Sequence, residues 1–343
     1  MTEDHHRDLD LEISIVNDNN KEGVRGCLRS VPGAARRIRY AVNVIDNVST
    51  DGSVDMLAVE FPHVAVRANV RRQGFAENHN QILRRVVATG TARYVLVLND
   101  DTELGPGALD EMVEAMDVAP RLGALAPSVV DGAGRVAATR LERPTAKTSW
   151  RYDWRGVGEL ADAEHGWLQG CCLLLRTEAI ADVGFFDERF FLFYEDGDLS
   201  RRLVEAAWSL AVCPQARITH FGHQTVLRPE LAIFTPMQGL RSRYLYFAKH
   251  EGRPRSSLIA WVGRGLMAAR GVRLILSGVR HRQLGGLRQG RVFLTLAAYN
   301  PRRAVSLPPR PSHVGVVPPT CPGERVDDLR VGASRTHPGW WWG

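Results

Sequence analysis

The sequence predicts an α/β protein with a mostly parallel, doubly wound sheet and a basic helical appendage after it. From Leu11 to about Pro127, apolar strands alternate with helical stretches, the order that produces parallel sheets with right-handed crossovers. The run YVLVL at 94–98 has no polar alternation, which is typical of a strand buried on both faces. Beyond Arg253 the composition changes to apolar positions mixed with arginines.

The elements of the first half are expected in a regular order. They are the strand LEISIVN (11–17), a helix near 23–31, the strands RYAVNVID (39–46) and HVAVRA (63–68), a helix near 78–88 and the strand YVLVLND (94–100). Ligands of parallel sheets bind beyond the carboxyl ends of the strands. The first half is therefore expected to bind a nucleotide or a molecule of similar shape.

The second half begins with a break in this pattern. Residues 132–155 are polar and rich in arginine, with three large aromatic residues, which fits either a mobile substrate loop or ordinary packing at a rim. A strand CCLLLR (171–176), a short helix TEAIADVG ending on Gly184 and an amphipathic helix DLSRRLVEAAW (198–208) follow.

We expect four parts along the chain. They are a flexible N-terminus (1–10), a main domain (11–250, halves 11–127 and 128–250), a basic amphipathic helical region (251–300) and a disordered tail (301–343). Within the basic region, apolar residues mixed with arginines fit helices that lie on an anionic membrane. A solvated appendage packed on the main domain fits the same pattern equally well.

Charge and cysteines limit the classes of protein. The net charge of +6 and a pI near 9.3 favour anionic partners. No helix-turn-helix or aromatic-basic platform indicates a nucleic-acid partner. The five cysteines are scattered and lack zinc-like spacing, and the N-terminus lacks the apolar core of a signal peptide. We expect reduced thiols, a cytoplasmic location and no membrane span.

Two acidic segments follow strands of the first half. In VIDNVSTDGS, Asp46 ends a strand and can accept hydrogen bonds from a base or a ribose, whereas Asp51 and Ser53 fit helix capping better. In LNDDTEL, the pair Asp100 and Asp101 fits either a helix start or hard oxygen ligands for Mg²⁺ or Mn²⁺ bridging a diphosphate.

A third acidic cluster and a histidine follow in the second half. Glu195, Asp196 and Asp198 come after the apolar run FFLFY, where desolvation would raise the pKa of a carboxylate toward that of a useful base. Asp198 fits a helix cap, which leaves Asp196 as the better base. His220 ends an apolar strand and is either a structural residue or a ligand for a metal near a diphosphate.

Six segments in order resemble glycosyltransferase family 2, the inverting GT-A enzymes, and most closely its rhamnosyltransferase-like branch. They are ISIVNDNN, VIDNVSTDGS, GFAENHN, VLNDDTEL, the stretch from WLQGCC to DLSRRL, and ITHFGHQT, within 11–225. The resemblance implies a nucleotide-binding group, a catalytic pair with Asp196 as general base, and metal ligands. The implied nucleotide-binding residues are Asn19, Asp46, Asn80 and Asp100. The implied catalytic pair is Glu195 and Asp196, and the implied metal ligands are Asp101 and His220.

Three departures from the family pattern stand out. The chain has Asn17-Asp18-Asn19 where Thr-Tyr-Asn is frequent, Asn99 in place of the first aspartate of the D-x-D element, and Arg72 in place of an asparagine. Asn99 removes one negative charge from the expected metal site.

The resemblance implies a transferase that moves a sugar from a nucleotide diphosphate donor, with dTDP-rhamnose favoured, to a cell-envelope or lipid-linked glycan. It implies single displacement and a divalent cation, Mg²⁺ or Mn²⁺, that stabilises the leaving group. The basic C-terminal region is consistent with peripheral contact at the inner face of an anionic membrane. The alternatives are a non-catalytic nucleotide-sugar-binding or assembly protein and a nucleotidyltransferase. The latter normally has a Gly-rich phosphate loop after the first strand, of which NDNNKEGVRG is a poor version.

Overall fold

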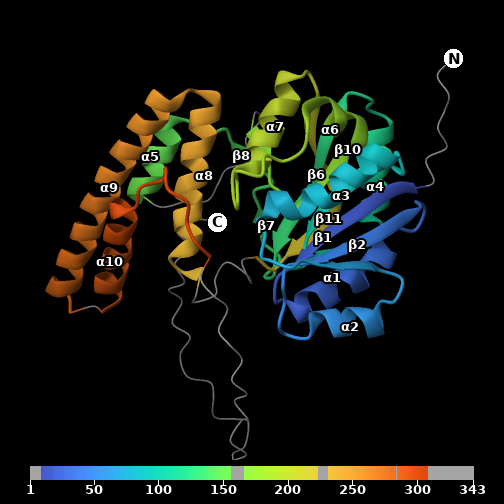
Figure 1. The fold of residues 1–343 in the computed structure, drawn as a ribbon, viewed down its shortest axis with the longest axis horizontal. Coiled ribbons are helices and arrows are strands. Elements are labelled where there is room, and N and C mark those ends of the chain that lie inside the picture. Colours follow the sequence, from blue (N-terminus) through green and yellow to red (C-terminus); the bar gives the residue numbers. More distant parts are fainter. Residues whose placement is uncertain (1–8, 156–165, 223–230, 283, 308–343) are drawn as a thin grey trace, which may run out of the picture.

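The computed structural model describes residues 9–155, 166–222, 231–282 and 284–307 (Figure 1). The first half contains β1 (Leu9–Asn17), α1 (Lys21–Ala34), β2 (Tyr40–Asp46), α2 (Ser53–Glu60), β3 (Ala65–Ala68), α3 (Phe75–Thr89), β4 (Ala92–Asn99), β5 (Thr102–Leu104), α4 (Ala108–Asp117) and β6 (Leu122–Asp131). The second half contains β7 (Val136–Ala137), β8 (Arg140–Glu142), α5 (Ala146–Arg155), β9 (Gly166–Leu168), β10 (Cys172–Arg176), α6 (Thr177–Val183), α7 (Glu195–Glu205) and β11 (Ser209–His220). Three helices follow: α8 (Phe234–His250), α9 (Arg253–Arg280) and α10 (Leu284–Ala298).

The central sheet has the strand order β3-β2-β1-β4-β10-β6-β11-β5. Strands β1 to β4 pair in parallel, whereas β10 lies antiparallel between β4 and β6. In this register Asn17 is opposite Asp46, and Val16 is opposite Asn99. The carboxyl ends of three strands therefore meet at one edge, and the predicted α/β fold class is confirmed.

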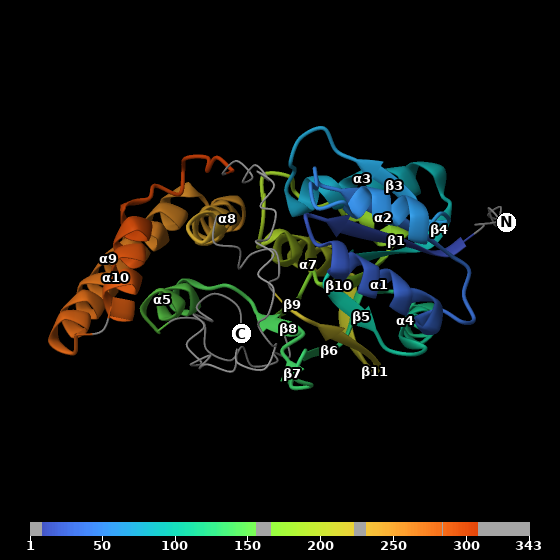
Figure 2. The same cartoon turned by 90° about the horizontal axis from the view of Figure 1, so that it is seen from below.

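Strand β4 is buried on both faces, as its unbroken apolar run predicts. Leu96 and Leu98 belong to a core with α1, α2 and α4, whereas Val95 and Val97 belong to a second core with α3, α6 and α7. Figures 1 and 2 show the two helical layers on opposite faces of the sheet. This double burial holds the end of β4, and the acidic residues after it, in a fixed position.

The polar stretch 132–155 is not simply a loop, which corrects one of the two sequence interpretations. Helix α5 covers its last 10 residues and packs against α9. Trp150 donates from Nε1 to the carbonyl of Ile259 at 3.2 Å, and the buried pair Arg243–Asp153 joins α5 to α8 at 2.8 Å. The aromatic residue Trp150 thus belongs to packing between helices.

Helices α8, α9 and α10 form a helical region beside the sheet domain (Figure 1). Helix α9 packs against α5, α8 and α10, and Met267 and Phe293 lie in a small core there. The region is therefore packed, as one of the two sequence interpretations has it. Within the described ranges, no helix is both long enough and apolar enough to cross a membrane.

Two sequence expectations concern the ends of the chain. Leu9 and Asp10 already belong to β1, so the flexible N-terminus expected for 1–10 is wrong for these two residues. Residues 1–8 and 308–343, which include most of the expected disordered tail, lie outside the described residues. The four described cysteines, Cys27, Cys171, Cys172 and Cys213, are free thiols, as predicted.

Candidate active site

Asp46 is held at the shared strand edge by its neighbours. Its Oδ1 accepts a hydrogen bond from Asn17 Nδ2 at 2.9 Å, and its Oδ2 accepts one from Ser49 N at 2.8 Å. The hydroxyl of Ser49 in turn accepts from Asn17 Nδ2 and from the backbone N–H of Asn19. Asn19 also bonds Thr50 in both directions. The structure thus brings together Asp46 and Asn19, two of the predicted nucleotide-binding residues, through Ser49, which sequence reasoning did not single out.

Two departures from the family pattern turn out to be partners. Asp18 Oδ2 and Arg72 Nη2 form an ion pair at 3.1 Å, and Asn47 Nδ2 donates to the same carboxylate at 3.0 Å. Both charged side chains are largely buried. The aspartate after β1 is therefore balanced by the arginine before α3. Relative to the family pattern, the negative charge gained at position 18 is offset by the positive charge gained at position 72.

The end of β4 meets the end of β11 around Asp101. Asp101 Oδ1 and His220 Nε2 lie 3.1 Å apart, and Asn99 Nδ2 lies 3.4 Å from the same ring nitrogen. Pairing of β5 with β11 sets this geometry because it places Thr102 opposite His220. The two predicted metal ligands are therefore adjacent.

Asp100 lies beside this pair and is buried. Burial, and next the charge of Asp101, raise the pKa of Asp100 well above its ordinary value. Its Oδ2 accepts no hydrogen bond from any described residue. A buried, orphaned carboxylate oxygen is costly unless a proton or a cation satisfies it.

The residues at this strand end fit a divalent cation that takes some of its ligands from the protein and the others from a substrate and water. Among the described residues, no three His, Cys, Asp or Glu side chains come together as a complete metal site. Mg²⁺ characteristically takes only one or two carboxylates and completes its shell with water and substrate phosphates. Asp101 and His220 offer two donors of that kind, and the preceding residue, Asp100, has an unsatisfied carboxylate oxygen.

Asp196 lies in the first turn of α7, which begins after a strained turn. Phe193 and Tyr194 both have left-handed backbone angles, with φ of 72° and 68°, which is unusual for large side chains. Asp196 Oδ2 accepts from Gly170 N at 3.0 Å and Oδ1 from Gly197 N at 2.7 Å. Burial raises the pKa of Asp196 to about 6, although these two backbone N–H groups lower it. A carboxylate with this pKa is ionised at neutral pH and basic enough to accept a proton.

Glu195 lies deeper than its neighbour. It is 4% exposed, and its Oε2 has no described hydrogen-bond partner. Burial, and then the charge of Asp196, raise the pKa of Glu195 well above its usual range. Of the predicted catalytic pair, Asp196 is thus the carboxylate that is ready to accept a proton.

Cys171 connects the two carboxylate groups. Burial raises the pKa of the Cys171 thiol to about 12, and the charges of Asp101 and Asp196 both contribute to that rise. Its carbonyl accepts a hydrogen bond from Asn99 N at 2.9 Å. Gly170 N donates to Asp196, and the next residue, Cys171, accepts from Asn99 at the end of β4. The backbone of 170–171 thus links Asp196 to the strand end that Asp101 follows.

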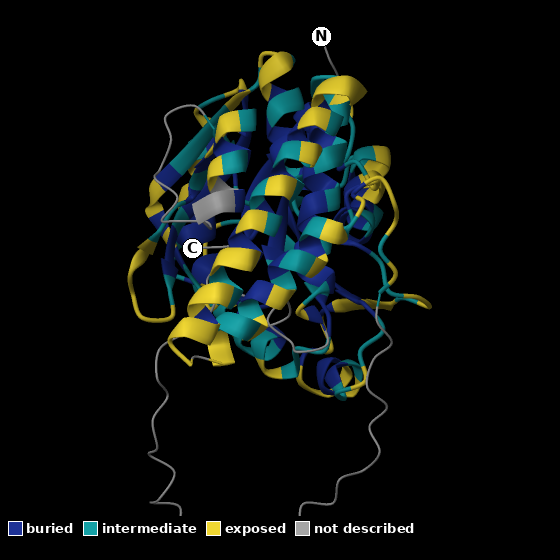
Figure 3. Ribbon diagram, turned by 90° about the vertical axis from the view of Figure 1, so that its left-hand side faces the viewer, coloured by how far each residue is buried: buried dark blue, intermediate teal, exposed yellow. Residues whose placement is uncertain are grey.

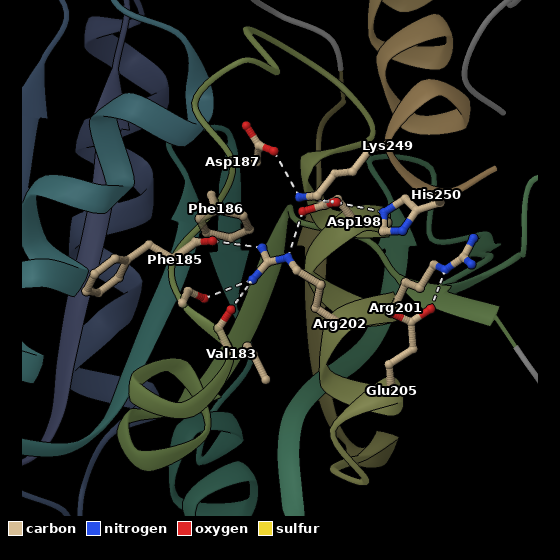
Figure 4. Close-up of polar contacts among 12 residues, drawn as sticks. Val183, Phe185, Phe186, Asp187, Asp198, Arg201, Arg202, Glu205, Lys249 and His250 are labelled. Carbon is tan, nitrogen blue, oxygen red and sulfur yellow. Dashed lines mark hydrogen bonds and ion pairs between the residues drawn. The ribbon is translucent and has the colours of Figure 1, made fainter. Parts of the chain in front are cut away.

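Asp198 does not cap α7, contrary to the sequence interpretation. Its carboxylate is fully buried and points toward α8, where Oδ1 accepts from Lys249 Nζ at 2.7 Å and from His250 Nε2 at 2.8 Å (Figure 4). Oδ2 accepts from Arg202 Nε at 2.9 Å. Burial alone would raise the pKa of Asp198, but these partners offset it and lower the pKa. Asp198 joins the helix of Asp196 to the C-terminal helices.

Asn80 is placed apart from the other predicted nucleotide ligands. It is fully buried, and its side-chain Nδ2 donates to the carbonyl of Phe186 and to Glu188, both at 2.9 Å. Its Oδ1 accepts from Phe186 N. These bonds attach α3 to the segment that leads into α7. In this structure Asn80 therefore holds the segment before α7 against α3.

Comparisons with known proteins found similar sequences. The model of the family described as Glycosyl transferase family 2 matches residues 12–184. The curated N-acetylglucosaminyl-diphospho-decaprenol L-rhamnosyltransferase of Mycobacterium tuberculosis, found in two strains, is 30% identical, over 70% of this chain and 85% of its own length.

Solved structures are similar at low identity. Mannosyltransferase PcManGT from Pyrobaculum calidifontis has a TM-score of 0.47 at 15% identity, and the match covers 84% of this chain and 86% of that one. S. aureus TarS has a TM-score of 0.46 at 14% identity and covers 73% of this chain and 42% of its own.

Proposed function

This chain belongs to glycosyl transferase family 2 and is a glycosyltransferase, and on that premise we propose that it transfers an L-rhamnosyl group to a lipid-linked N-acetylglucosamine. The proposed donor is a nucleoside diphosphate sugar, with dTDP-rhamnose favoured. The name of the mycobacterial relative supports both the sugar and the class of acceptor. The proposed acceptor is an N-acetylglucosaminyl diphosphate carried by a polyprenol.

The observation that carries the proposal is the backbone link between Asp196 and the end of β4, where Gly170 N donates to Asp196 and Cys171 accepts from Asn99. Transfer with inversion needs a base on one side of the anomeric carbon and a way to stabilise the diphosphate that leaves from the other. Asp196 takes the proton of the acceptor hydroxyl while the hydroxyl oxygen forms its bond to the anomeric carbon. The bond from that carbon to the diphosphate oxygen breaks in the same step.

The other residues bind and orient the donor. Asp46, fixed by Asn17 and Ser49, is proposed to bind the base or ribose of the nucleotide, next to Asn19. Asp101 and His220, with Asp100 beside them, are proposed to hold Mg²⁺ or Mn²⁺. When bound there, the cation supplies positive charge to the leaving diphosphate.

A lipid-linked acceptor requires contact with a membrane, and helix α9 offers a surface for it. Four apolar residues, Trp261, Val272, Leu276 and Val279, are 73%, 49%, 64% and 64% exposed. The helix also carries arginines and no acidic residue. Exposed residues recur along the helices on this side of the molecule (Figure 3). We propose that this face lies on an anionic membrane, on the cytoplasmic side.

A panel of donors tests the proposal. Release of the nucleoside diphosphate is measured with dTDP-rhamnose, UDP-galactofuranose, UDP-glucose and UDP-N-acetylglucosamine, with Mn²⁺ or Mg²⁺, with and without N-acetylglucosaminyl diphosphoprenol. We expect release from dTDP-rhamnose that the acceptor stimulates. Acceptor-stimulated release from another donor would mean that the sugar of that donor, and not rhamnose, is transferred. Donor binding without turnover would favour a non-catalytic sugar-nucleotide-binding protein, and absence of binding would contradict the function.

A further inference from the structure

A second polar cavity lies outside the strand-edge site. It has a volume of about 720 Å³ and lies where α8 ends and α9 begins. Its walls include four cationic side chains, from Arg189, Lys249, Arg253 and Arg302, together with Tyr244 and Ser257, and no carboxylate of the described residues lines it. Such a concentration of one charge in a hollow focuses the electrostatic potential and favours an anionic ligand.

The cations of the cavity are only partly neutralised by neighbours. Asp187 contacts both Arg189 and Lys249, at 2.6 and 2.9 Å, and Asp198 contacts Lys249. Asp198 is itself also paired with Arg202. The other two cations, Arg253 and Arg302, lie in a different environment.

Arg302 and Arg253 have no carboxylate partner among the described residues. Arg302 Nη2 donates to the neutral hydroxyl of Ser257 at 2.7 Å, and its guanidinium lies over the ring of Tyr244. Arg253 begins α9, where the positive end of the helix dipole adds to its charge. The wall therefore keeps a net positive charge, and two guanidinium groups are available for an anion.

The cavity adjoins α7 on the side of Asp198, the face opposite to that of Asp196. Lys249 reaches Asp198, which follows Asp196 by two residues on α7 (Figure 4). On its other side, the cavity-lining Ser257 is followed by Leu258 and, one turn later, Trp261, which are 56% and 73% exposed. A ligand in the cavity would thus lie between the catalytic helix and the exposed apolar surface of α9.

We propose that this cavity binds the diphosphate group of the lipid-linked acceptor. The inference rests on the proposed function and adds the place where the acceptor is recognised. A diphosphate diester carries two negative charges and several oxygens, which match the paired N–H donors of Arg253 and Arg302. The sugar then extends toward the first turn of α7, which carries both Asp198 and Asp196, and the polyprenyl chain extends toward Leu258 and Trp261.

The test compares two acceptors in cavity variants. One acceptor is a water-soluble, short-chain prenyl diphosphate of N-acetylglucosamine, and the other is a neutral alkyl glycoside of the same sugar. Arg253→Ala and Arg302→Ala are each expected to raise KM for the diphosphate acceptor about tenfold, the effect of losing one charged hydrogen bond. KM for the donor and for the neutral acceptor should change less than about twofold.

Arg255→Ala is the matched control, because Arg255 lies in the same turn of α9, pairs with Glu251 at 2.7 Å and does not line the cavity. An unchanged KM for the diphosphate acceptor in both cavity variants would overturn the inference. An equal rise in KM for both acceptors would also overturn it, because it would indicate a structural defect. So would a wild-type enzyme that does not distinguish the two acceptors.

Two further arms separate this inference from its premises. If the wild type transfers to neither acceptor, the proposed function fails, and calorimetric binding of the short-chain prenyl diphosphate then tests the cavity alone. Binding that Arg253→Ala weakens supports the cavity, and absence of binding overturns it. Sedimentation with phosphatidylglycerol vesicles tests the other source of phosphate. If Arg253→Ala loses vesicle binding but keeps its KM for the soluble acceptor, the cavity binds membrane headgroups instead.

Discussion

The two faces of helix α7 hold aspartates two residues apart in opposite environments. Among the described residues, Asp196 is held by backbone N–H groups alone, from Gly170 and Gly197, and burial raises its pKa to about 6. Asp198 is surrounded by Arg202, Lys249 and His250, which lower its pKa against the effect of burial. Position on the helix therefore decides the role. We propose that the face with no described cation provides the base, whereas the face with cations attaches α7 to α8.

The largest effect expected on the attachment face comes from Asp198→Asn. It leaves Arg202 and Lys249 beside a neutral amide, and we expect the free energy of unfolding to fall by about 3 kcal/mol. Urea denaturation at pH 7 measures this. The control is Asp182→Asn, an exposed aspartate bonded to Trp208.

The pH dependence of this difference has a definite sign. A carboxylate whose pKa is lowered by folding stabilises the protein above its ordinary pKa of 3.8, and this contribution is lost as the pH falls through the folded value. The gap between wild type and Asp198→Asn should therefore narrow below about pH 4. A gap that is small at pH 7 would contradict the attachment role.

Asp101→Asn extends the comparison to the other carboxylate pair. It removes a charge beside His220, and we expect transfer to fall roughly 10- to 100-fold at a fixed cation concentration, with partial recovery at higher Mn²⁺. Glu103→Gln, an exposed neighbour, is the control. The same cation dependence in both variants would argue against a cation at Asp101.

The pH profile of transfer distinguishes the two aspartates of α7 directly. If Asp196 is the base, kcat/KM should fall about tenfold per pH unit below about pH 6, because the protonated carboxyl cannot accept a proton. Buffers from pH 4.5 to 8, with the fold monitored in parallel, give the profile. A base with a lowered pKa, such as Asp198, would instead stay active in acid.

The smallest effect is expected from Lys249→Met. Lys249 is partly exposed, and Asp198 keeps Arg202 and His250 when it is removed. We expect the free energy of unfolding to fall by about 1 kcal/mol, and denaturation beside Asp198→Asn measures it. A loss as large as that of Asp198→Asn would mean that the three partners act as one unit.

Local patterns predicted the sheet and its acidic edge. The unbroken apolar run of β4 indicated burial on both faces, and the acids directly after β2 and β4 had to lie at the strand ends. Asp101 and His220 could be paired only through the resemblance, because β11 lies far along the chain.

Contacts distant in sequence explain what was missed. Asp198 looked like a helix cap because its partners on α8 lie 51 and 52 residues later. Asn80 is bonded to Phe186, at a separation of 106 residues. Helix α5 is polar and arginine-rich, and its stability depends on Arg243 and α9. No local pattern carries such information.

The central claim is that Asp196 is the base, and acceptor-stimulated release of the nucleoside diphosphate by Asp196→Asn tests it most directly. The variant keeps the size of the side chain but cannot take a proton. We predict a loss of roughly 10³-fold in kcat, with a urea midpoint close to that of the wild type. Activity within about tenfold of the wild type would contradict the assignment and move the base to another group.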